Sequence, residues 1–288
     1  MTKPKVLITG AGGMLATALE RVLGTVCSLA TFTESQLDIT NRDAVLDAVR
    51  KVGPDVIVNA AAYTAVDRCE TEERRAALVN GTAVGYLAQA AEATGTRIVH
   101  FSTDYIFDGE KEGPYREDDI PNPVSAYGRS KLLGEQELVR FTRHAIVIRT
   151  QWLYGENGNN FVDTIIQLAR QRDELKIVDD QYGSPTYTMD LARVVGWFVE
   201  HRDDHPDVWG QVFNFSNEGV VSWFGFAREI LRLAGIGTRL IPVDTAAFPR
   251  PARRPPNSAL DKTKIRRLTN IDIRPWPDAL YEYMRRMV

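Results

Sequence analysis

The sequence predicts an α/β protein built around a doubly wound parallel sheet. Short runs rich in β-branched residues alternate with stretches of helical periodicity, and these runs are apolar on both faces, as strands covered by helices on each side require. Right-handed crossovers between such strands produce a doubly wound sheet. The expected strands are Lys5–Thr9, Ser28–Thr33, Asp55–Asn59, Ile98–Ser102, Ala145–Arg149 and Gln211–Phe215. The expected helices among them are Met14–Leu23, Arg42–Val52, Arg74–Thr94 and Ala126–Phe141.

The alternation becomes less regular after residue 150. We expect helices at Phe161–Arg172, Tyr187–Glu200 and Asp278–Met287, and a short loop rich in proline and arginine at Phe248–Asn257. These features predict a smaller, discontinuous C-terminal substrate subdomain, made of residues 151–186 and 216–288. Residues 1–150, together with 187–215, are expected to form the dinucleotide-binding part.

Composition and charge are those of an ordinary globular protein. The 288 residues are 44% hydrophobic and 25% charged, and the formal net charge of -3 does not indicate a nucleic-acid or membrane partner. No apolar run approaches the ~20 residues of a membrane helix, and Met1–Lys5 leads directly into a strand, so we expect no signal peptide. Cys27 and Cys69 are isolated, which favours a reducing, cytoplasmic compartment over a disulfide scaffold. His201 and His205 have helical spacing, but a proline follows, and we expect a solvated helix end rather than a metal site.

A glycine-rich turn joins the first expected strand to the first helix. Its sequence, Gly10-Ala-Gly-Gly13-Met-Leu-Ala16, permits a tight turn, and the helix start presents free N–H groups to a pyrophosphate. The alternative is a strand–helix turn without a ligand, but the strand before it and the helix after it favour a Rossmann-type dinucleotide site. The second strand, Ser28–Thr33, ends with neither an acidic residue nor an arginine. Since such a pocket does not repel a 2′-phosphate, NADPH is preferred over NADH, and Asp38 and Ile39 are candidates for adenine contacts.

Tyr127 and Lys131 lie four residues apart and therefore share one face of a helix. An ammonium group about 4 Å from a phenol favours its ionisation by roughly 4 kcal/mol at an effective dielectric constant near ~20. This corresponds to about three pKa units, enough to bring the pKa of a tyrosine from ~10 to ~7. Thr103, at the end of an apolar strand, is the third candidate. The alternative is a solvent-facing Tyr–Lys pair and a threonine that only ends a strand.

Several motifs together resemble the extended short-chain dehydrogenase/reductases. They are Gly10-x-x-Gly13-x-x-Ala16, Asn59–Ala62, Ser102–Asp104 and Tyr127-x-x-x-Lys131. Within that superfamily the chain is similar over nearly its whole length to the dTDP-4-dehydrorhamnose reductase family. The stretches that carry this similarity are Asp55–Asp67, Val79–Thr82, Phe101–Gly109, Arg149–Gly155, Asp180–Thr186 and Arg254–Ser258.

The resemblance implies a catalytic assignment. Thr103 would hydrogen-bond the substrate ketone, and Tyr127 would protonate its oxygen as hydride reaches C4. Lys131 would lower the pKa of Tyr127 and bind the nicotinamide ribose, and Asn80 would hold that lysine through a water molecule. An alternative for Asn80 is a local hydrogen bond within a helix. The implied cofactor-binding residues are Gly10, Gly13, Met14, Leu15, Asp38, Ile39, Ala60, Ala61, Ala62, Asn80, Tyr127 and Lys131.

The resemblance also implies a dTDP-linked 4-keto-6-deoxy sugar as substrate. The implied substrate-binding residues are Val66, Thr103, Asp104, Tyr105, Trp152, Arg253 and Arg254. Trp152 offers a flat face for the sugar, with a core position as the alternative, and the two arginines offer charge-assisted hydrogen bonds to a diphosphate, with a solvated cluster as the alternative. Some family members bind magnesium between subunits, but Tyr187–Leu191 provides one carboxylate, so we expect no metal and a monomer or a homodimer.

Two other functions are compatible with the same scaffold. The first is a nucleotide-sugar 4,6-dehydratase or 4-epimerase, but dehydratases of this superfamily carry a glutamate where this chain has Tyr105. An epimerase is expected to retain bound NAD through purification. The second is a non-catalytic regulatory subunit that resembles the methionine adenosyltransferase beta subunit. Cofactor oxidation separates an enzyme from a regulatory subunit, and the intact Thr103, Tyr127 and Lys131 favour the enzyme.

Overall fold

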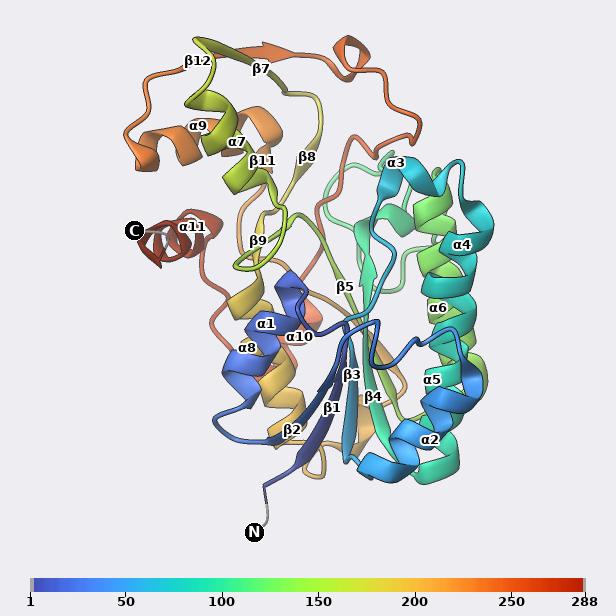
Figure 1. Ribbon diagram of the computed structural model, residues 1–288. Coiled ribbons are helices and arrows are strands. Elements are labelled where there is room, and N and C mark those ends of the chain that lie inside the picture. The colour runs from blue at the N-terminus through green and yellow to red at the C-terminus, as the bar shows by residue number, and fades with distance from the viewer. Residues whose placement is uncertain (1–2, 287–288) are drawn as a thin grey trace.

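Six parallel strands form the central sheet of the computed structural model, which describes residues 3–286 (Figure 1). Their order across the sheet is β10-β5-β4-β3-β1-β2. The strands are β1 (Lys5–Thr9), β2 (Ser28–Phe32), β3 (Val56–Asn59), β4 (Arg97–Thr103), β5 (Ala145–Thr150) and β10 (Gln211–Asn214). The predicted doubly wound sheet is therefore confirmed, and all six strands lie within one or two residues of their expected bounds.

The strand order reverses beside β1. The chain runs from β1 outward to β2 and then returns to the other side of β1 to form β3. In sheets of this kind, ligands bind outside the carboxyl ends of the strands at the point of reversal. The glycine turn after β1 lies at this point.

Helices cover both faces of the sheet (Figure 1). On one face lie α1 (Met14–Leu23) and α8 (Thr188–Glu200), and on the other lie α2 (Arg42–Val52), α5 (Ala83–Thr94) and α6 (Ala126–Phe141). Because successive side chains of a strand point to opposite faces, β1 contributes Val6 and Ile8 to the core under α1 and Leu7 to the core under α2 and α5. Both layers are fully buried, which explains why the strand sequences are apolar throughout.

The helix expected at Arg74–Thr94 is wrong as a single α-helix. It is divided into α4 (Glu73–Ala77), a π-helical turn η1 (Leu78–Thr82) and α5. Close packing on α6 accompanies the turn, because a Cβ atom at Gly134 would lie 2.2 Å from the carbonyl oxygen of Asn80. Single π turns occur frequently at functional sites, and this one contains Asn80.

A second group of elements lies above the carboxyl edge of the sheet (Figure 1). It contains α7 (Phe161–Ala169), α9 (Trp223–Ala234) and a parallel pair, β7 (Glu174–Val178) with β12 (Arg239–Val243). Two short pairs connect this group to the sheet below: β8 (Tyr182–Gly183) with β11 (Val221–Ser222), and β6 (Leu153–Tyr154) with β9 (Thr186–Tyr187). The remaining elements are α3 (Val66–Cys69), α10 (Thr263–Thr269), α11 (Trp276–Arg286) and three 3-10 turns, η2 (Asp104–Ile106), η3 (Pro206–Val208) and η4 (Thr245–Ala247).

One buried apolar cluster extends from the main sheet into this upper group. It includes Ile8 of β1, Phe198 of α8 and Phe226 of α9. The division of the chain near residue 150 stays a prediction. Helix α7 ends at Ala169, before the expected Arg172, and the last helix begins earlier than expected, while the expected end at Met287 lies outside the described residues.

Two observations concern the surroundings of the protein. Within residues 3–286, no helix combines the length and the apolar character needed to cross a bilayer. Cys27 and Cys69 are both buried and free.

Candidate active site

The glycine turn lies directly on the segment that follows β3. Gly10 has a φ of 74°, and a Cβ atom there would lie 2.8 Å from both the carbonyl carbon of Ala60 and the nitrogen of Ala61. Gly13 is the N-cap residue of α1, where no side chain caps the free N–H groups of the first turn. Backbone N–H groups that point out of a helix start, with no side chain above the turn, suit a pyrophosphate. The structure thus brings together the expected cofactor segments Gly10–Leu15 and Ala60–Ala62, and their shape fits a dinucleotide.

Asp38 and Ile39, the residues expected near the adenine, differ in exposure. Asp38 is exposed, and its carboxylate accepts hydrogen bonds from the N–H (2.9 Å) and the hydroxyl (2.7 Å) of Thr40. These hydrogen bonds lower the pKa of Asp38. The side chain of Ile39 is packed in the core beside α2, so only its backbone is free for the expected adenine contact, which stays a prediction.

Thr103 and Tyr127 meet at the carboxyl end of β4. The Thr103 hydroxyl donates to a carboxylate oxygen of Asp104 (2.9 Å) and accepts from the N–H of Tyr105 (3.2 Å). The ring of Tyr105 meets the ring of Tyr127 edge-on, with centroids 5.6 Å apart. A Cβ atom at Gly128 would lie 2.0 Å from the carbonyl oxygen of Tyr105, so the first turn of α6 packs directly on the turn that follows β4. This packing fixes Tyr127 beside Thr103.

The pKa of Tyr127 moves opposite to the expectation. Burial raises it above the ordinary value, the charge on Asp104 adds to the rise, and a hydrogen bond with Thr103 opposes it. The amine of Lys131 is directed to β4, where it donates to the carbonyl oxygen of Phe101 (2.6 Å). The expected lowering of the Tyr127 pKa is therefore contradicted: burial dominates, and the effect that opposes it is the hydrogen bond with Thr103 rather than the charge of Lys131.

Lys131 and Asp104 are also shifted towards their neutral forms. Burial lowers the pKa of Lys131 to about 8, although the nearby charge of Glu135 opposes this effect. Burial raises the pKa of Asp104 to about 6. One carboxylate oxygen of Asp104 is buried and has no hydrogen-bond partner among the described residues.

Asn80 is bonded to the loop after β3. Its side-chain oxygen accepts from the N–H of Tyr63 (2.7 Å), and its amide group donates to the carbonyl oxygen of Tyr63 (2.9 Å) and to the Ser130 hydroxyl (3.0 Å). Asn80 therefore joins that loop to the residue next to Lys131. Its support of the lysine through a water molecule stays a prediction.

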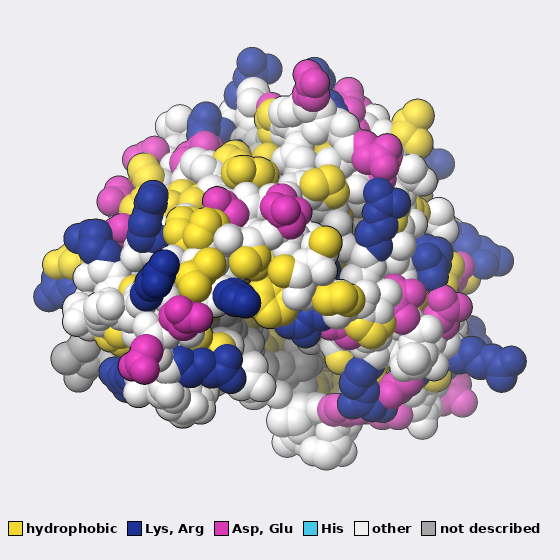
Figure 2. All heavy atoms as spheres, turned by 90° about the horizontal axis from the view of Figure 1, so that it is seen from above, with side chains coloured by type: hydrophobic (Ala, Val, Ile, Leu, Met, Phe, Trp, Pro, Cys, Tyr) yellow, Lys and Arg dark blue, Asp and Glu magenta, His cyan; other side chains and the backbone are white. Residues whose placement is uncertain are grey.

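A cleft of about 1230 Å3 opens beside Tyr105. This volume exceeds the ~300–1,000 Å3 of most small-molecule sites, so the cleft has room for a large ligand. Hydrophobic and basic side chains lie next to one another on the upper face of the molecule (Figure 2). The cleft combines aromatic and basic lining residues, including Tyr105, Phe161, Trp223, Arg250, Arg253 and Arg254.

The two predicted arginines in this cleft differ in their surroundings. Arg254 donates to both carboxylate oxygens of Asp67 (2.6 and 2.9 Å) and to the carbonyl oxygen of Ala252 (2.6 Å). Its guanidinium is thereby held in place beside α3. Arg253 has 62% of its side chain exposed and forms one surface ion pair with Glu110. Arg253 is thus the more available of the two, and the contact of either arginine with a substrate stays a prediction.

Trp152 lies behind the cleft wall. Its backbone has a φ of 46°, and its ring stacks on Trp223 with centroids 3.5 Å apart. Trp223 lines the cleft, so Trp152 supports a residue that faces it. Val66, the first residue of α3, precedes the carboxylate that holds Arg254. Contacts of Trp152 and Val66 with a sugar stay predictions.

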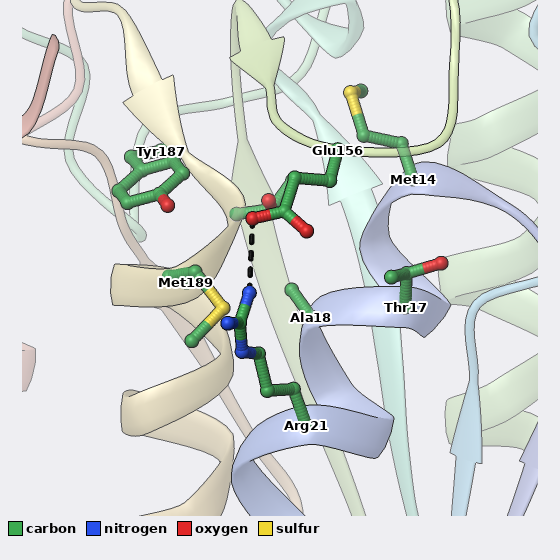
Figure 3. A pocket seen from close by; sticks show the side chains of 8 residues that line it. Met14, Thr17, Ala18, Arg21, Glu156, Tyr187 and Met189 are labelled. Atoms are coloured by element: carbon green, nitrogen blue, oxygen red, sulfur yellow. Dashed lines mark hydrogen bonds and ion pairs between the residues drawn. The ribbon is translucent and has the colours of Figure 1, made fainter. Parts of the chain in front are cut away.

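A second, small cavity lies between α1 and α8 (Figure 3). Its volume is about 10 Å3, and an ion pair between Arg21 and Glu156 (2.9 Å) crosses its edge. Such a space holds at most one water molecule, so this cavity is not a substrate site. Among residues 3–286, no group of three or more His, Cys, Asp or Glu side chains is arranged to bind a metal ion.

The fold and the site define a class of protein. A doubly wound sheet with a glycine turn at its point of reversal, and a strand-end threonine beside a Tyr-x-x-x-Lys helix, define the short-chain dehydrogenase/reductases. Residues 4–288 match the family described as the RmlD substrate binding domain, and the chain belongs to this family.

Named relatives extend the comparison. The dTDP-4-dehydrorhamnose reductase of Aggregatibacter actinomycetemcomitans is 43% identical, and the alignment covers 96% of this chain and 97% of the relative. A probable dTDP-4,6-dihydroxy-2-methyloxan-3-one 4-ketoreductase of Streptomyces antibioticus is 40% identical, with 96% and 93% covered. The crystal structure of dTDP-4-dehydrorhamnose reductase from Bacillus anthracis str. Ames in complex with NADP has a TM-score of 0.94 and 34% identity, and covers 99% of this chain and 100% of that one.

Sequence reasoning missed several residues of the site. Asp67 lies within a motif that was recognised, but its pairing with Arg254 spans 187 positions and has no local signal. Trp223 and Arg250 line the cleft from segments without a motif. His100 carried a usable signal, because it is a titratable residue in the middle of an otherwise apolar strand.

Proposed function

We propose that this protein is an NADPH- or NADH-dependent reductase, with NADPH favoured, that transfers hydride to C4 of dTDP-4-dehydro-L-rhamnose and forms dTDP-L-rhamnose. The proposal depends on one observation: the expected general acid, Tyr127, lies next to the large cleft. Tyr127 contacts Tyr105, and Tyr105 lines a cleft whose volume is large enough for a nucleotide sugar. Arginines that line the same cleft suit a diphosphate.

The residues of the chain divide the work. The turn at Gly10–Gly13 and the start of α1 would hold the pyrophosphate of the cofactor, and the nicotinamide, when bound, supplies the hydride. Burial keeps the Tyr127 phenol protonated at neutral pH, the form that a general acid needs. As C4 accepts hydride, the phenol gives its proton to the ketone oxygen, and the ketone becomes a secondary alcohol.

Thr103 has a choice of hydrogen-bond acceptor. Its hydroxyl donates a hydrogen bond to the Asp104 carboxylate. To donate to the ketone instead, the hydroxyl must turn away from that carboxylate, or Asp104 must be protonated. The raised pKa of Asp104, about 6, makes the protonated form accessible under mildly acidic conditions. The protonation state of Asp104 therefore decides whether the Thr103 hydroxyl is free to donate to the ketone.

The relatives support the substrate and the cofactor to different degrees. The relative from A. actinomycetemcomitans is named for the proposed reaction, and the structure from B. anthracis contains NADP. The relative from S. antibioticus is named for a different ketosugar at similar identity, so the sugar must be tested directly. A cytoplasmic location and a monomeric or homodimeric state stay predictions.

The decisive experiment follows NADPH and NADH absorbance with dTDP-4-dehydrorhamnose made in situ. We expect oxidation of NADPH with this substrate and slower oxidation with UDP- or GDP-linked 4-keto sugars. Tyr127→Phe removes the proton donor, and we expect a loss of at least about 100-fold in kcat with cofactor affinity unchanged.

Tyr281→Phe is the matched control, because Tyr281 is 53% exposed on α11. It should behave as the wild type. Full turnover by Tyr127→Phe would contradict the assigned acid. Cofactor binding without oxidation of any 4-keto sugar would favour a regulatory role, and bound NAD in the purified protein would favour an epimerase.

A further inference from the structure

A row of buried polar side chains runs beneath the site from one strand to the next. Thr9 of β1 donates to the side-chain oxygen of Asn59 on β3 (2.7 Å), and the amide nitrogen of Asn59 lies 3.0 Å from Nδ1 of His100 on β4. Nε2 of His100 lies 3.5 Å from the amine of Lys131 on α6. All four side chains are at most 3% exposed. The row connects the residue before Gly10 to the catalytic lysine.

The direction of these hydrogen bonds follows from Asn59. Its side-chain oxygen also accepts from the backbone N–H of Ala61 (3.3 Å), a group that can only donate. The oxygen must therefore face Thr9 and Ala61, and the NH2 group must face His100. Since an amide NH2 group only donates, Nδ1 of His100 must accept and carries no proton. A neutral His100 then carries its proton on Nε2.

We propose that His100 is a positioning residue for Lys131: held as the Nε2–H tautomer by Asn59 and Thr9, it directs a donor at the lysine amine and so disfavours the ammonium form. A protonated amine at this place would put two donors face to face. At 3.5 Å from the amine, Nε2 is at the long limit for a hydrogen bond, and with its proton in place it offers the ammonium no acceptor. A neutral amine instead accepts from His100 while it donates to Phe101.

Burial of the amine itself disfavours the ammonium, and the charged groups around Lys131 do not add to that effect. The titratable neighbours on its own helix are Tyr127 and Glu135, and the charge of Glu135 favours the ammonium. Glu135 is itself paired with Arg149 of β5 (2.8 Å). From the strands, His100 is the titratable neighbour, and burial lowers its pKa well below the ordinary value, in agreement with a neutral ring.

The consequence concerns the return of a proton to Tyr127. This step rests on the proposed function. After Tyr127 has given its proton to the ketone oxygen, the phenolate must be protonated again. Lys131, one turn further along α6, would supply this proton to the phenolate oxygen, because an ammonium destabilised by His100 is a stronger acid than an ordinary lysine; the amine is then left in the neutral form that His100 favours. Solvent then restores the proton on the amine.

The first test measures the tautomer in wild-type protein without substrate. Nitrogen-15 NMR of histidine-labelled protein should show His100 with a proton on Nε2 and none on Nδ1 from pH 6 to 9. The sequence has four histidines, so His100→Gln identifies the signal by its loss. His144→Gln is the control, because His144 is exposed. A proton on Nδ1, or on both nitrogens at pH 7, would overturn the proposal.

The second test measures the lysine. Carbon-13 NMR of labelled lysine, assigned with Lys131→Met, should give a pKa for Lys131 that rises by about one unit in His100→Gln, the size of one lost unfavourable contact with a charged group. His144→Gln should leave it unchanged. In activity assays the alkaline limb of kcat should shift upward by the same amount.

The outcomes separate the two proposals. An unchanged Lys131 pKa in folded His100→Gln would refute the role of His100, whatever the protein reduces. Absence of turnover with every 4-keto sugar would defeat the proposed function and leave both NMR results standing. If His100→Gln does not fold, single substitutions of the three other histidines assign the His100 signal by elimination, and the tautomer in the wild type then decides.

Discussion

Asp104 offers a prediction whose size follows from its burial. Its side chain is 2% exposed, and burial raises its pKa from 3.8 to about 6. A shift of about two units corresponds to roughly 3 kcal/mol at ~1.36 kcal/mol per unit. The folded state therefore disfavours the ionised carboxylate, and we expect Asp104→Asn to increase the free energy of unfolding at pH 7 by up to about 3 kcal/mol.

The sign of the pH dependence is fixed by the raised pKa. Between pH 3.8 and about 6 the folded protein keeps a proton on Asp104 that the unfolded chain has released, so wild-type stability falls as the pH rises through this window. The amide introduced by Asp104→Asn would not titrate, and the Thr103 hydroxyl would still find an oxygen acceptor there. The stability advantage of Asp104→Asn should thus be fully present above pH 6 and vanish below pH 4.

Urea unfolding of both proteins at pH 4, 5, 6, 7 and 8 measures this difference. Asp118→Asn is the matched control, since the Asp118 side chain is 73% exposed and its loss should change stability by a small, constant amount. A difference between wild type and Asp104→Asn that stays constant over this range, or a less stable variant at pH 8, would refute the reasoning.

Three further predictions concern the glycine turn, the arginine and the lysine. Gly10→Ala should destabilise the protein and weaken cofactor binding more than Gly95→Ala, since both have positive φ but only Gly10 faces backbone atoms, at 2.8 Å; equal effects in urea unfolding and cofactor fluorescence titrations would contradict this. Asp67→Asn should raise the KM for the nucleotide sugar several-fold by loosening Arg254, and an unchanged KM would show that this pair does not shape the cleft. Lys131→Met should lower both kcat and cofactor affinity, and a fluorescence titration that gives the wild-type cofactor Kd would exclude the predicted ribose contact.

The parts of the site that sequence reasoning predicted are those with a short signal along the chain. The glycine turn follows a strand directly, and Tyr127 and Lys131 occupy successive turns of one helix. Such patterns fix position, because the fold that carries them is regular. The sheet was predictable for the same reason, since fully buried strands have a composition that helices on both faces require.

The parts that were missed depend on distant segments. The single helix expected at Arg74–Thr94 contains a π turn at the place where Asn80 packs against Gly134 on another helix. The pKa of Tyr127 was expected to fall because the spacing identifies Lys131 as a neighbour, whereas the burial that raises this pKa is set by distant segments. Spacing along the sequence predicts which side chains lie close together. Their burial, which the sequence does not show, determines their protonation states.

Burial is the common cause of the chemistry at this site. It moves the pKa values of Asp104, Tyr127, Lys131 and His100 in the direction that favours each neutral form. A ketone that gains hydride develops negative charge on its oxygen, and neutral O–H and N–H donors can meet that charge without a competing ion pair in the resting site. The same burial makes Asp104 a source of instability, so Asp104→Asn should stabilise the fold, but it should weaken the reaction because an asparagine cannot be protonated to release the Thr103 hydroxyl. The stability that Asp104→Asn gains and the activity that it loses, each relative to the wild type, should therefore have the same origin.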